Sequence, residues 1–409
     1  MNTTGRLYYL DSYLLEFTAR VTAFAEMDDQ RFAVTLDETA FYPTGGGQPS
    51  DTGTLESSTG VARVVECIDA GSEGVLHVIE GEPPQTGARV AGRIDWPRRF
   101  EHLQQHTAQH ILSQAFIKLY DAETHGFRIM ERWSEIDVRL ENPSAERIRQ
   151  ATQLANEIVW ENRPVRVRLV TAEEAARMSL RKAPQREGVL RIVEIEGFDT
   201  NACGGTHARA TGEVGVIFAR SWERAKGMTR IEFVAGTRAL KDYDIVNETA
   251  HRIAASFSVG RDEIEQSTLR LTDEHKELSR RLRALEATLI EAEAEELIRQ
   301  INPGLNERRI VARIFDRRDH ESLKQLAQML IQRPQTIVLL ASTDGGAARL
   351  VFARSPDIQA DMNLLMREAC QELNGRGGGR PDMAQGGGQA NSTTLTQTLK
   401  LITERLNAN

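Results

Sequence analysis

The sequence predicts a multidomain protein of the mixed α+β class. Its 409 residues exceed the length at which a single hydrophobic core usually stops growing. Apolar residues make up 40% of the chain and charged residues 27%, which is the balance of a folded globular protein. The period of the apolar residues also changes along the chain. We therefore expect a small β-barrel at residues 1–92, an α/β domain at 93–240, a helical coiled-coil segment at 241–302 and a C-terminal α/β domain at 303–409.

Short alternating stretches between residues 7 and 92 predict small antiparallel strands. Arg31–Leu36 and residues 61–65 are two of them, and glycine, proline, serine and aspartate separate such stretches. Strands of this length and spacing are typical of a compact barrel. Residues 82–87 contain two prolines and a glycine and mark a turn near its end.

From Trp96 onward the spacing of the apolar residues becomes helical. A first helix is expected around residues 103–114, and a second should follow the start signal Asn142-Pro143-Ser144. Strands return at residues 165–170 and at Val189–Ile195. This part of the chain is therefore expected to mix helices and strands.

Residues 261–300 are charged and nearly free of glycine and proline. Their leucines follow alternate three- and four-residue steps, which predicts a coiled-coil seam. A helical hairpin that folds back within one chain is the alternative that this length leaves open. Asn302-Pro303-Gly304 is expected to stop the helix. Strands at 310–315 and 336–341, with a helix at 323–331 between them, predict the final α/β domain.

Charge and cysteine content narrow the classes of function. A formal net charge of −8 argues against coating nucleic acid over the whole surface, although basic patches can be local. No apolar run approaches membrane-spanning length, and the N-terminus lacks the apolar core of a signal peptide. We expect a cytoplasmic protein without a membrane partner. The three cysteines are widely separated and odd in number, so a disulfide framework is not expected, and a thiolate ligand is open.

Three histidines and one cysteine are the candidate metal ligands. His106 and His110 lie four residues apart, so on a helix both imidazoles project from the same face. Cys203-Gly204-Gly205-Thr206-His207 adds a thiolate and a third imidazole across a flexible turn. Either half alone is also typical of ordinary surface or core residues. Together they predict one zinc ion per chain, bound by His106, His110, Cys203 and His207.

The number of ligands bears on the role of this zinc. Thr107 stands where a helical zinc protease has its glutamate, so a peptidase is not favoured. Closed sites with four protein ligands are usually structural, whereas catalytic zinc keeps a position for water. Two hypotheses follow. Either one residue, with His207 as our candidate, is loosely held, or the metal mainly positions the substrate.

Two glycine-rich segments are candidate ligand sites. Residues 41–53 contain Gly45, Gly46 and Gly47, which let the backbone approach a ligand, while Thr44 and Gln48 offer hydrogen bonds. An ordinary glycine-rich hairpin is the alternative, and no Lys-Ser or Lys-Thr follows, so this is not a nucleotide P-loop. Residues 375–388 combine guanidinium groups with exposed amides, which suits an RNA backbone better than a plain linker. The candidate RNA-binding residues there are Arg376, Gly377, Gly378, Gly379 and Arg380.

These four segments, in this order, resemble alanyl-tRNA editing proteins of the AlaX family, in the long form that also carries the C-terminal domain of alanyl-tRNA synthetase. The resemblance covers essentially the whole chain. It is strongest at residues 94–99, which lead into the helix of His106 and His110, and at residues 201–207. The terminal glycine-rich segment is nearly as distinctive.

The resemblance implies a zinc-dependent hydrolase that removes serine, and glycine as a second candidate, from mischarged alanine tRNA, acting in trans on the released aminoacyl-tRNA. It also implies that the four ligands named above form the zinc set of a zinc-bearing editing domain, and that Thr44 with Gly45, Gly46, Gly47 and Gln48 belongs to the amino-acid pocket. The charging domain of the synthetase has no counterpart in this sequence, so we expect no aminoacylation. The helical segment and the last domain are implied to bind the outer corner of tRNA and to promote a homodimer.

A physical limit explains why such an activity is needed. A pocket sized for alanine excludes the smaller glycine poorly and resists serine only modestly, so a second, hydrolytic site must supply the discrimination. Thr44 is our candidate for the group that hydrogen-bonds the seryl hydroxyl, which alanine lacks. The sequence does not identify a general base.

Two other functions stay open at this point. One is a non-catalytic, zinc-stabilised tRNA-binding protein. The other comes from the last domain, which resembles a module also attached to DHH-family phosphoesterases. Those enzymes need an Asp/His metal cluster, and Asp319-His320 is the only trace of one that we find, more typical of a solvated helix start.

Overall fold

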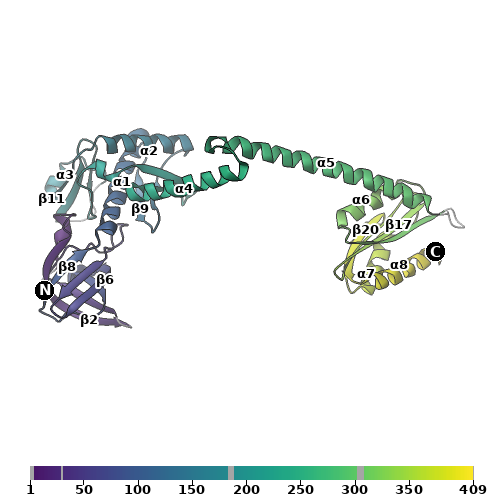
Figure 1. Cartoon of the computed structure of the whole chain (residues 1–409), viewed down its shortest axis with the longest axis horizontal. Coiled ribbons are helices and arrows are strands. Elements are labelled where there is room, and N and C mark those ends of the chain that lie inside the picture. Colours follow the sequence, from purple (N-terminus) through teal and green to yellow (C-terminus); the bar gives the residue numbers. More distant parts are fainter. Residues whose placement is uncertain (1–3, 29–30, 183–187, 302–307, 409) are drawn as a thin grey trace. The chain divides into compact units, whose positions relative to one another are not determined.

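The structure is a computed structural model that describes residues 4–28, 31–182, 188–301 and 308–408. It divides into two compact units, Met1–Ser256 and Phe257–Asn409, which are described separately (Figure 1). Among the described residues, no helix is long and apolar enough to cross a membrane.

The sequence predicts a small barrel of antiparallel strands, and the first unit begins with a closed barrel of six such strands. The strands close in the order β2-β3-β7-β6-β5-β8, and β2 pairs with β8 to complete the ring. Alternate side chains of each strand fill the interior, for example Val90 and Ile94. The strands are β2 (Glu16–Asp28), β3 (Arg31–Leu36), β5 (Gly53–Ser57), β6 (Gly60–Asp69), β7 (Val75–Glu80) and β8 (Arg89–Ile94).

A two-stranded pair and two short 3-10 helices complete this part of the chain. They are β1 (Gly5–Arg6) with β4 (Glu38–Thr39), which run parallel, and η1 (Leu7–Tyr9) with η2 (Gly71–Glu73). The glycine-rich loop at residues 40–52 connects β4 to β5. Its last residue, Thr52, accepts a hydrogen bond at 2.8 Å from the amide of Asp95, the residue that precedes the next helix.

After the barrel, the chain of the first unit packs around helix α1 (Trp96–Tyr120). Asp95 caps its N-terminus by accepting a hydrogen bond from the Arg98 amide, and Pro97 suits the first turn. Most of α1 is buried against α2 (Ala145–Trp160) and a four-stranded antiparallel sheet of order β14-β15-β10-β9. These strands are β9 (Thr124–Ile129), β10 (Ser134–Val138), β14 (Ile217–Ala225) and β15 (Met228–Ala235).

A second, three-stranded sheet holds the segment that carries the cysteine. Its antiparallel order is β11 (Val165–Thr171), β12 (Val189–Ile195) and β13 (Asp199–Ala202). The predicted strands at 165–170 and 189–195 are confirmed. The short helix α3 (Ala172–Ala176) packs on β11 and β12, η3 (Thr211–Val214) packs against α1 and α2, and α4 (Gly236–Phe257) follows β15.

A buried ion pair ties the glycine-rich loop to α1. Arg99 and Asp51 are both fully buried, and Arg99 Nη2 lies 2.5 Å from Asp51 Oδ2. Asp51 also accepts a hydrogen bond from the amide of Tyr42, at the start of the loop. Since an unpaired charge at this depth would be costly, the pair holds the loop in one position against the helix.

The second unit begins with η4 (Arg261–Glu263) and the single long helix α5 (Ile264–Arg299). Its 36 residues form one continuous helix, so no hairpin folds back within this segment. The leucines of the predicted seam are 53–69% exposed in the single chain, namely Leu271, Leu278, Leu282, Leu285 and Leu289. Coiled-coil pairing stays a prediction. The expected helix stop at 302–304, and with it the expected domain boundary at 303, lies outside the described residues.

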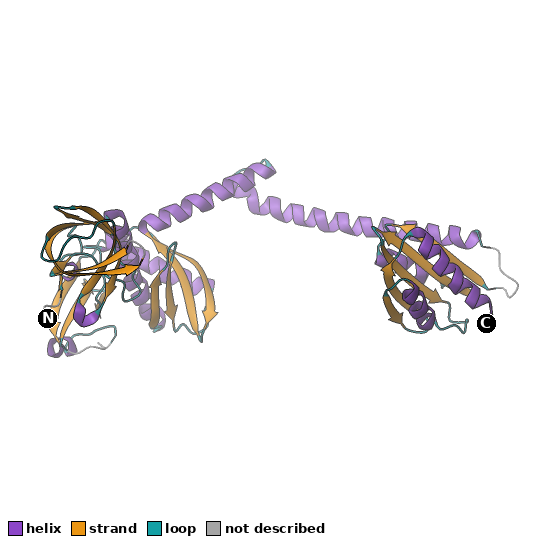
Figure 2. Cartoon of the chain, turned by 90° about the horizontal axis from the view of Figure 1, so that it is seen from below, coloured by secondary structure: helices purple, strands orange, loops and turns teal. Residues whose placement is uncertain are grey.

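The C-terminal part is a five-stranded sheet with helices on both faces (Figure 2). The end of α5 and α6 (His320–Leu330) cover one face, and α7 (Met362–Glu372) and α8 (Ser392–Ala408) cover the other. The sheet order is β16 (Arg309–Asp316), β17 (Thr336–Asp344), β18 (Ala347–Arg354), β20 (Met383–Gln389) and β19 (Arg376–Gly379), with only β16 and β17 parallel.

Candidate metal centre and substrate cavity

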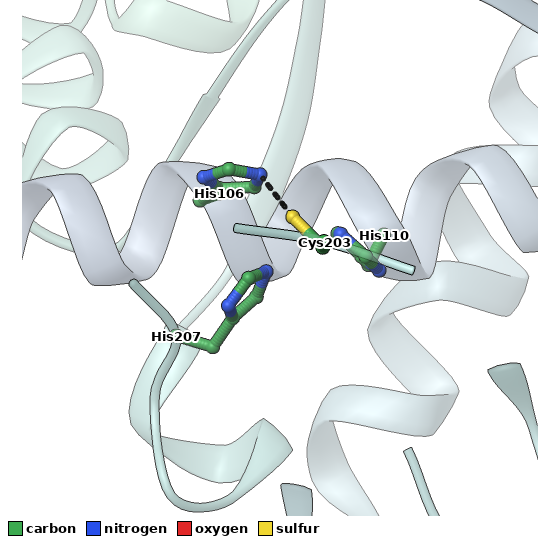
Figure 3. A group of neighbouring side chains, drawn as sticks. All are labelled: His106, His110, Cys203 and His207. Atoms are coloured by element: carbon green, nitrogen blue, oxygen red, sulfur yellow. Dashed lines mark hydrogen bonds between the residues drawn. The ribbon is translucent and has the colours of Figure 1, made fainter. Parts of the chain in front are cut away.

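The four predicted ligands come together in the first unit, and their side chains point toward one another (Figure 3). His106 and His110 lie one turn apart on α1, while Cys203 and His207 come from the loop that follows β13. One nitrogen of each histidine and the sulfur all lie within 4.8 Å of one another. His106 Nε2 is 3.3 Å from Cys203 Sγ.

Each of the three imidazoles is held by an oxygen at its other nitrogen. His106 Nδ1 is 2.8 Å from Gln48 Oε1, His110 Nδ1 is 3.0 Å from Asp199 Oδ2, and His207 Nδ1 is 3.1 Å from the Gly205 carbonyl. Since these oxygens accept, Nδ1 donates in each case and Nε2 keeps a free lone pair. The three Nε2 atoms are therefore available to one metal ion.

Gln48 is fixed in the orientation that this arrangement requires. Its Oε1 also accepts from the Thr206 amide at 3.2 Å, and its Nε2 donates to Thr206 Oγ1 at 2.8 Å. Asp199 is fixed in the same way, because Arg181 Nε donates to its Oδ1 at 2.9 Å. The side chains that hold His106 and His110 are thus themselves held by further hydrogen bonds.

The protonation states of His207 and Cys203 suit a metal site, whereas His110 is different: burial disfavours its charged ring, but its hydrogen bonds to Asp199 and Cys203 outweigh burial and raise its pKa. Burial lowers the pKa of His207 to about 3, so its ring is neutral. Burial by itself favours the neutral thiol of Cys203, but the surrounding His106, His207 and His110 outweigh it and hold the pKa well below its usual value. Neutral imidazole and thiolate are the forms that bind metals.

The donor set fits a zinc ion. Tetrahedral zinc bonds of about 2.0–2.3 Å place the donor atoms roughly 3.3–3.6 Å apart, so small side-chain rotations close the observed group onto one ion. His207 Nε2 is a buried nitrogen without a hydrogen-bond partner, which is costly unless something else binds it. Gly205 allows the close packing, because a Cβ there would lie 2.1 Å from Cε1 of His106.

Two cavities open on the candidate metal centre. One of about 640 Å³ is lined by Thr44, Gly45 and Gly46 together with His106 and Cys203. The other, of about 570 Å³, lies toward β9 and shares His106, Cys203 and Gly46 with the first. A substrate group in either cavity would lie against His106 and Cys203, and in the second cavity also against His110.

The residues of the glycine-rich loop divide into two groups. Thr44 is exposed to the first cavity, and its Oγ1 accepts from the Ser50 amide at 3.1 Å, which leaves its own hydrogen free to donate. Gly47 supports the loop instead, since a Cβ there would lie 2.2 Å from the Phe127 carbonyl oxygen. Gln48 is buried and orients His106, a role that its sequence position does not reveal.

Other cavity residues had no signal in the sequence. Three tyrosines, two arginines and one lysine line the first cavity: Tyr8, Tyr9, Tyr42, Arg6, Arg191 and Lys182. Asp199 bonds to the ring of His110 and precedes Cys203 by only four residues. Its closeness to Cys203 in the sequence is a signal by which it could have been found. The others approach the centre only through the tertiary fold.

The candidate RNA-binding residues lie in the second unit. Arg376, Gly377, Gly378 and Gly379 form β19, and Arg380 follows it with an ion pair to Asp382 at 3.1 Å. Both arginines are exposed. Gly377 has a packing role of its own, because a Cβ there would lie 2.6 Å from the sulfur of Cys370 on α7.

Three family models match the chain. They are the threonyl and alanyl tRNA synthetase second additional domain at residues 190–232, the class II (A) tRNA synthetases at residues 12–98 and the DHHA1 domain at residues 306–408. The first of these covers Cys203 and His207, and the second covers the barrel and the glycine-rich loop.

Curated relatives match over nearly the whole chain. The alanyl-tRNA editing protein AlaX-L of Pyrococcus horikoshii is 30% identical over 93% of this chain and 94% of its own. The alanine–tRNA ligase of Methanoregula boonei is 35% identical over 94% of this chain but 42% of its own. The chain spans less than half the length of the ligases that it matches. A solved C-Ala domain of Aquifex aeolicus alanyl-tRNA synthetase is 34% identical over 24% of this chain and 90% of its own, with a TM-score of 0.23.

Proposed function

The chain belongs to the AlaX family of alanyl-tRNA editing proteins, and from this premise we propose that it is a zinc-dependent hydrolase that releases serine from mischarged alanine tRNA. Glycine is a second candidate substrate. The observation that carries the proposal is the convergence of three imidazole nitrogens and one sulfur beside a cavity that Thr44 lines.

The residues of the candidate metal centre would bind the metal or orient its ligands. Nε2 of His106, His110 and His207 and the thiolate of Cys203 would hold one zinc ion per chain. Zinc bound there would supply positive charge that orients or polarises the aminoacyl ester. Gln48, Asp199 and the Gly205 carbonyl would keep the rings aimed at it.

Thr44 would recognise the seryl side chain. Its hydroxyl accepts from Ser50 and can donate to the seryl oxygen, whereas a methyl group in the same place offers no partner. A site built to hydrogen-bond a hydroxyl discriminates well against an analogue that lacks it. The exposed backbone of Gly45 and Gly46 beside Thr44 would line the same amino-acid pocket.

The decisive experiment compares deacylation of alanine tRNA charged with serine, glycine or alanine by the zinc-loaded protein. We expect repeated turnover of the seryl ester and little loss of alanine. Cys203→Ala should abolish serine release while tRNA binding persists, and undiminished hydrolysis would contradict the proposal. Thr44→Val, which removes the hydroxyl at nearly constant volume, should lower the ratio of seryl to alanyl hydrolysis.

We also propose that the second unit binds tRNA, with Arg376 and Arg380 contacting the RNA backbone. Both side chains are exposed beside backbone amides of glycine-rich strands, a combination suited to phosphate. Deleting residues from about 261 onward should weaken tRNA affinity and leave the metal in place. The exposed leucines of α5 support a homodimer, which sedimentation of the full chain against a variant with charged residues at Leu278 and Leu285 would test.

A non-catalytic tRNA-binding protein with a structural zinc is the second candidate, because a site with four protein donors is usually structural. The number of serines released per protein molecule distinguishes a hydrolase from a binding protein. A catalyst releases many serines per protein molecule, whereas a binding protein protects the ester or releases none.

A further inference from the structure

The proposed hydrolysis needs a group that takes a proton from the attacking water. If one zinc ion takes all four donors of the candidate metal centre, no position is left on it for a water whose pKa it could lower. A protein side chain must then act as the base. Such a side chain must line one of the two cavities that open on the centre.

The first cavity offers no free base among the residues that the structure describes. Its carboxylate, Asp69, accepts two hydrogen bonds from Arg6, at 2.7 and 2.8 Å. Phenols are protonated at neutral pH, and burial raises the pKa of Tyr8 and of Tyr42 further. The remaining titratable groups on this wall are candidate metal ligands, a further tyrosine, or the cationic side chains of arginine and lysine.

The second cavity is lined by one imidazole that is not a candidate ligand, that of His125 in β9. Its side chain is 31% exposed, so water and substrate can reach it. Its Nε2 lies 3.8 Å from the Glu123 carboxylate, and its Nδ1 bonds to no group in the described part of the chain. Since the carboxylate favours the proton on Nε2, Nδ1 keeps a lone pair that can accept a proton.

A β-bulge accounts for the position of His125. In the pairing of β9 with β10, Thr124 lies opposite Val138 and Gly126 lies opposite Asp137, so His125 is the extra residue between them. Bulges redirect a side chain out of the regular alternation of a strand, and they are frequent next to active sites. The bulge therefore marks His125 as the residue of β9 that departs from the packing pattern of the sheet.

The strand that carries this bulge is fixed against the candidate metal centre. The ring centroids of Phe127 and His106 are 5.0 Å apart, and the Ile129 amide donates to the Gly47 carbonyl at 2.7 Å. The strand thus contacts both a candidate ligand and the glycine-rich loop. His125, two residues before Phe127, is held in place beside the same centre.

We propose that His125 is the general base of the hydrolysis, with Nδ1 taking a proton from the attacking water. The water oxygen bonds to the ester carbonyl carbon. As the bond from that carbon to the ribose oxygen breaks, the imidazolium returns the proton to the ribose oxygen. Glu123 stabilises the imidazolium while it exists. Both cavities share His106 and Cys203, so an ester carbonyl held there beside Thr44 is open to water from the second cavity.

The inference rests on the proposed function, and its test uses the zinc-loaded full chain with seryl-tRNA. His125→Ala should lower kcat about 100- to 10,000-fold, while KM and zinc content stay those of the wild type. Added imidazole should restore part of the rate, because the truncated side chain leaves room for the same base in the cavity. Arg128→Ala is the matched control, since Arg128 is exposed on the same strand and pairs with Glu135 at 2.9 Å. It should leave kcat unchanged.

Glu123→Gln separates the imidazole from its neighbouring carboxylate. We expect it to lower kcat less than His125→Ala, because a carboxylate is a far weaker base than an imidazole at neutral pH. A larger loss in Glu123→Gln would assign the proton transfer to the carboxylate and overturn the proposal.

Two further results would overturn it. One is a kcat of His125→Ala close to that of the wild type, and the other is a loss that imidazole does not restore, which would make the role of His125 structural. If His125→Ala does not fold, His125→Gln decides, because glutamine keeps a polar side chain of similar size but takes up no proton; it should show the same loss. An inactive wild type would refute the proposed function, whereas an active wild type with equally active His125 variants would refute the general base alone.

Discussion

Replacing Gln48 with alanine should weaken metal binding without touching a metal ligand. The Gln48 side chain is buried and makes three hydrogen bonds, one to His106 Nδ1 and two to Thr206. Alanine would leave the His106 ring free to rotate and two donors without acceptors. Loss of such an outer partner typically lowers metal affinity about 10- to 100-fold, or about 1.4–2.7 kcal/mol.

Stability should fall in the same variant, because each buried polar group left unpaired costs about 1–3 kcal/mol. A control must therefore separate general destabilisation from an effect on the metal. Gln105 provides it, since it is buried on α1 next to His106 and bonds to both backbone groups of Ala235 and to Ser134, but to none of the four candidate ligands. Gln105→Ala should destabilise the fold to a similar degree.

The assay is competition for zinc with a chelator of known affinity, run beside urea unfolding of the metal-free proteins. We expect Gln48→Ala to lose zinc affinity and Gln105→Ala to keep it. Gln48→Glu should behave nearly as the wild type, because a carboxylate accepts the same two hydrogen bonds and the Thr206 hydroxyl can turn to donate. Equal zinc affinities of Gln48→Ala and Gln105→Ala would refute the orienting role.

Three further outcomes follow from the structure. Burial lowers the pKa of His77 in the barrel to about 4, so the unfolded chain takes up its proton first and stability falls as the pH drops below about 6.5. Between pH 7 and pH 5 the wild type should lose about 2 kcal/mol more unfolding free energy than His77→Gln, as measured by urea titration. Gly377→Ala should destabilise the second unit by about 1–3 kcal/mol because of the contact with Cys370, while Gly378→Ala, whose Cβ would meet only an amide oxygen at 3.2 Å, should cost less; thermal unfolding would show the order. Removing the metal with a chelator should stop deacylation and leave tRNA affinity unchanged, and loss of both would favour a purely structural metal.

The succession of elements was largely predictable, because each one carries its own local period. Alternating residues predicted the barrel, and the helical spacing before and after His106 predicted α1. Pairing across long distances was not predictable. The ring closure between β2 and β8, and the separation of the following strands into two sheets, depend on contacts that no local pattern records.

The candidate ligands could be predicted because they lie close together in the sequence. Their hydrogen-bond partners could not, because they lie far from the ligands in the sequence. His106 and His110 are separated by one helical turn, and Cys203 and His207 by one loop, so spacing alone suggests two pairs. Gln48 reaches His106 across 58 positions, and Arg191 reaches the Cys203 loop from another strand. Such partners become visible only when the barrel, α1 and the second sheet pack together.

The structure also bears on whether a zinc ion with four protein ligands could keep a position for water. Our hypothesis made His207 the loosely held member, yet its Nε2 is buried, without a protein partner and grouped with the other three donors, while its Nδ1 is held by Gly205. His207 differs from the other three donors in that it lines neither cavity. If one zinc ion takes all four donors, no position is left for a bound water. Hydrolysis would then depend on how the cavity holds the ester against the metal, and the groups that line the cavity without being ligands, above all Thr44, become the ones to decide the rate.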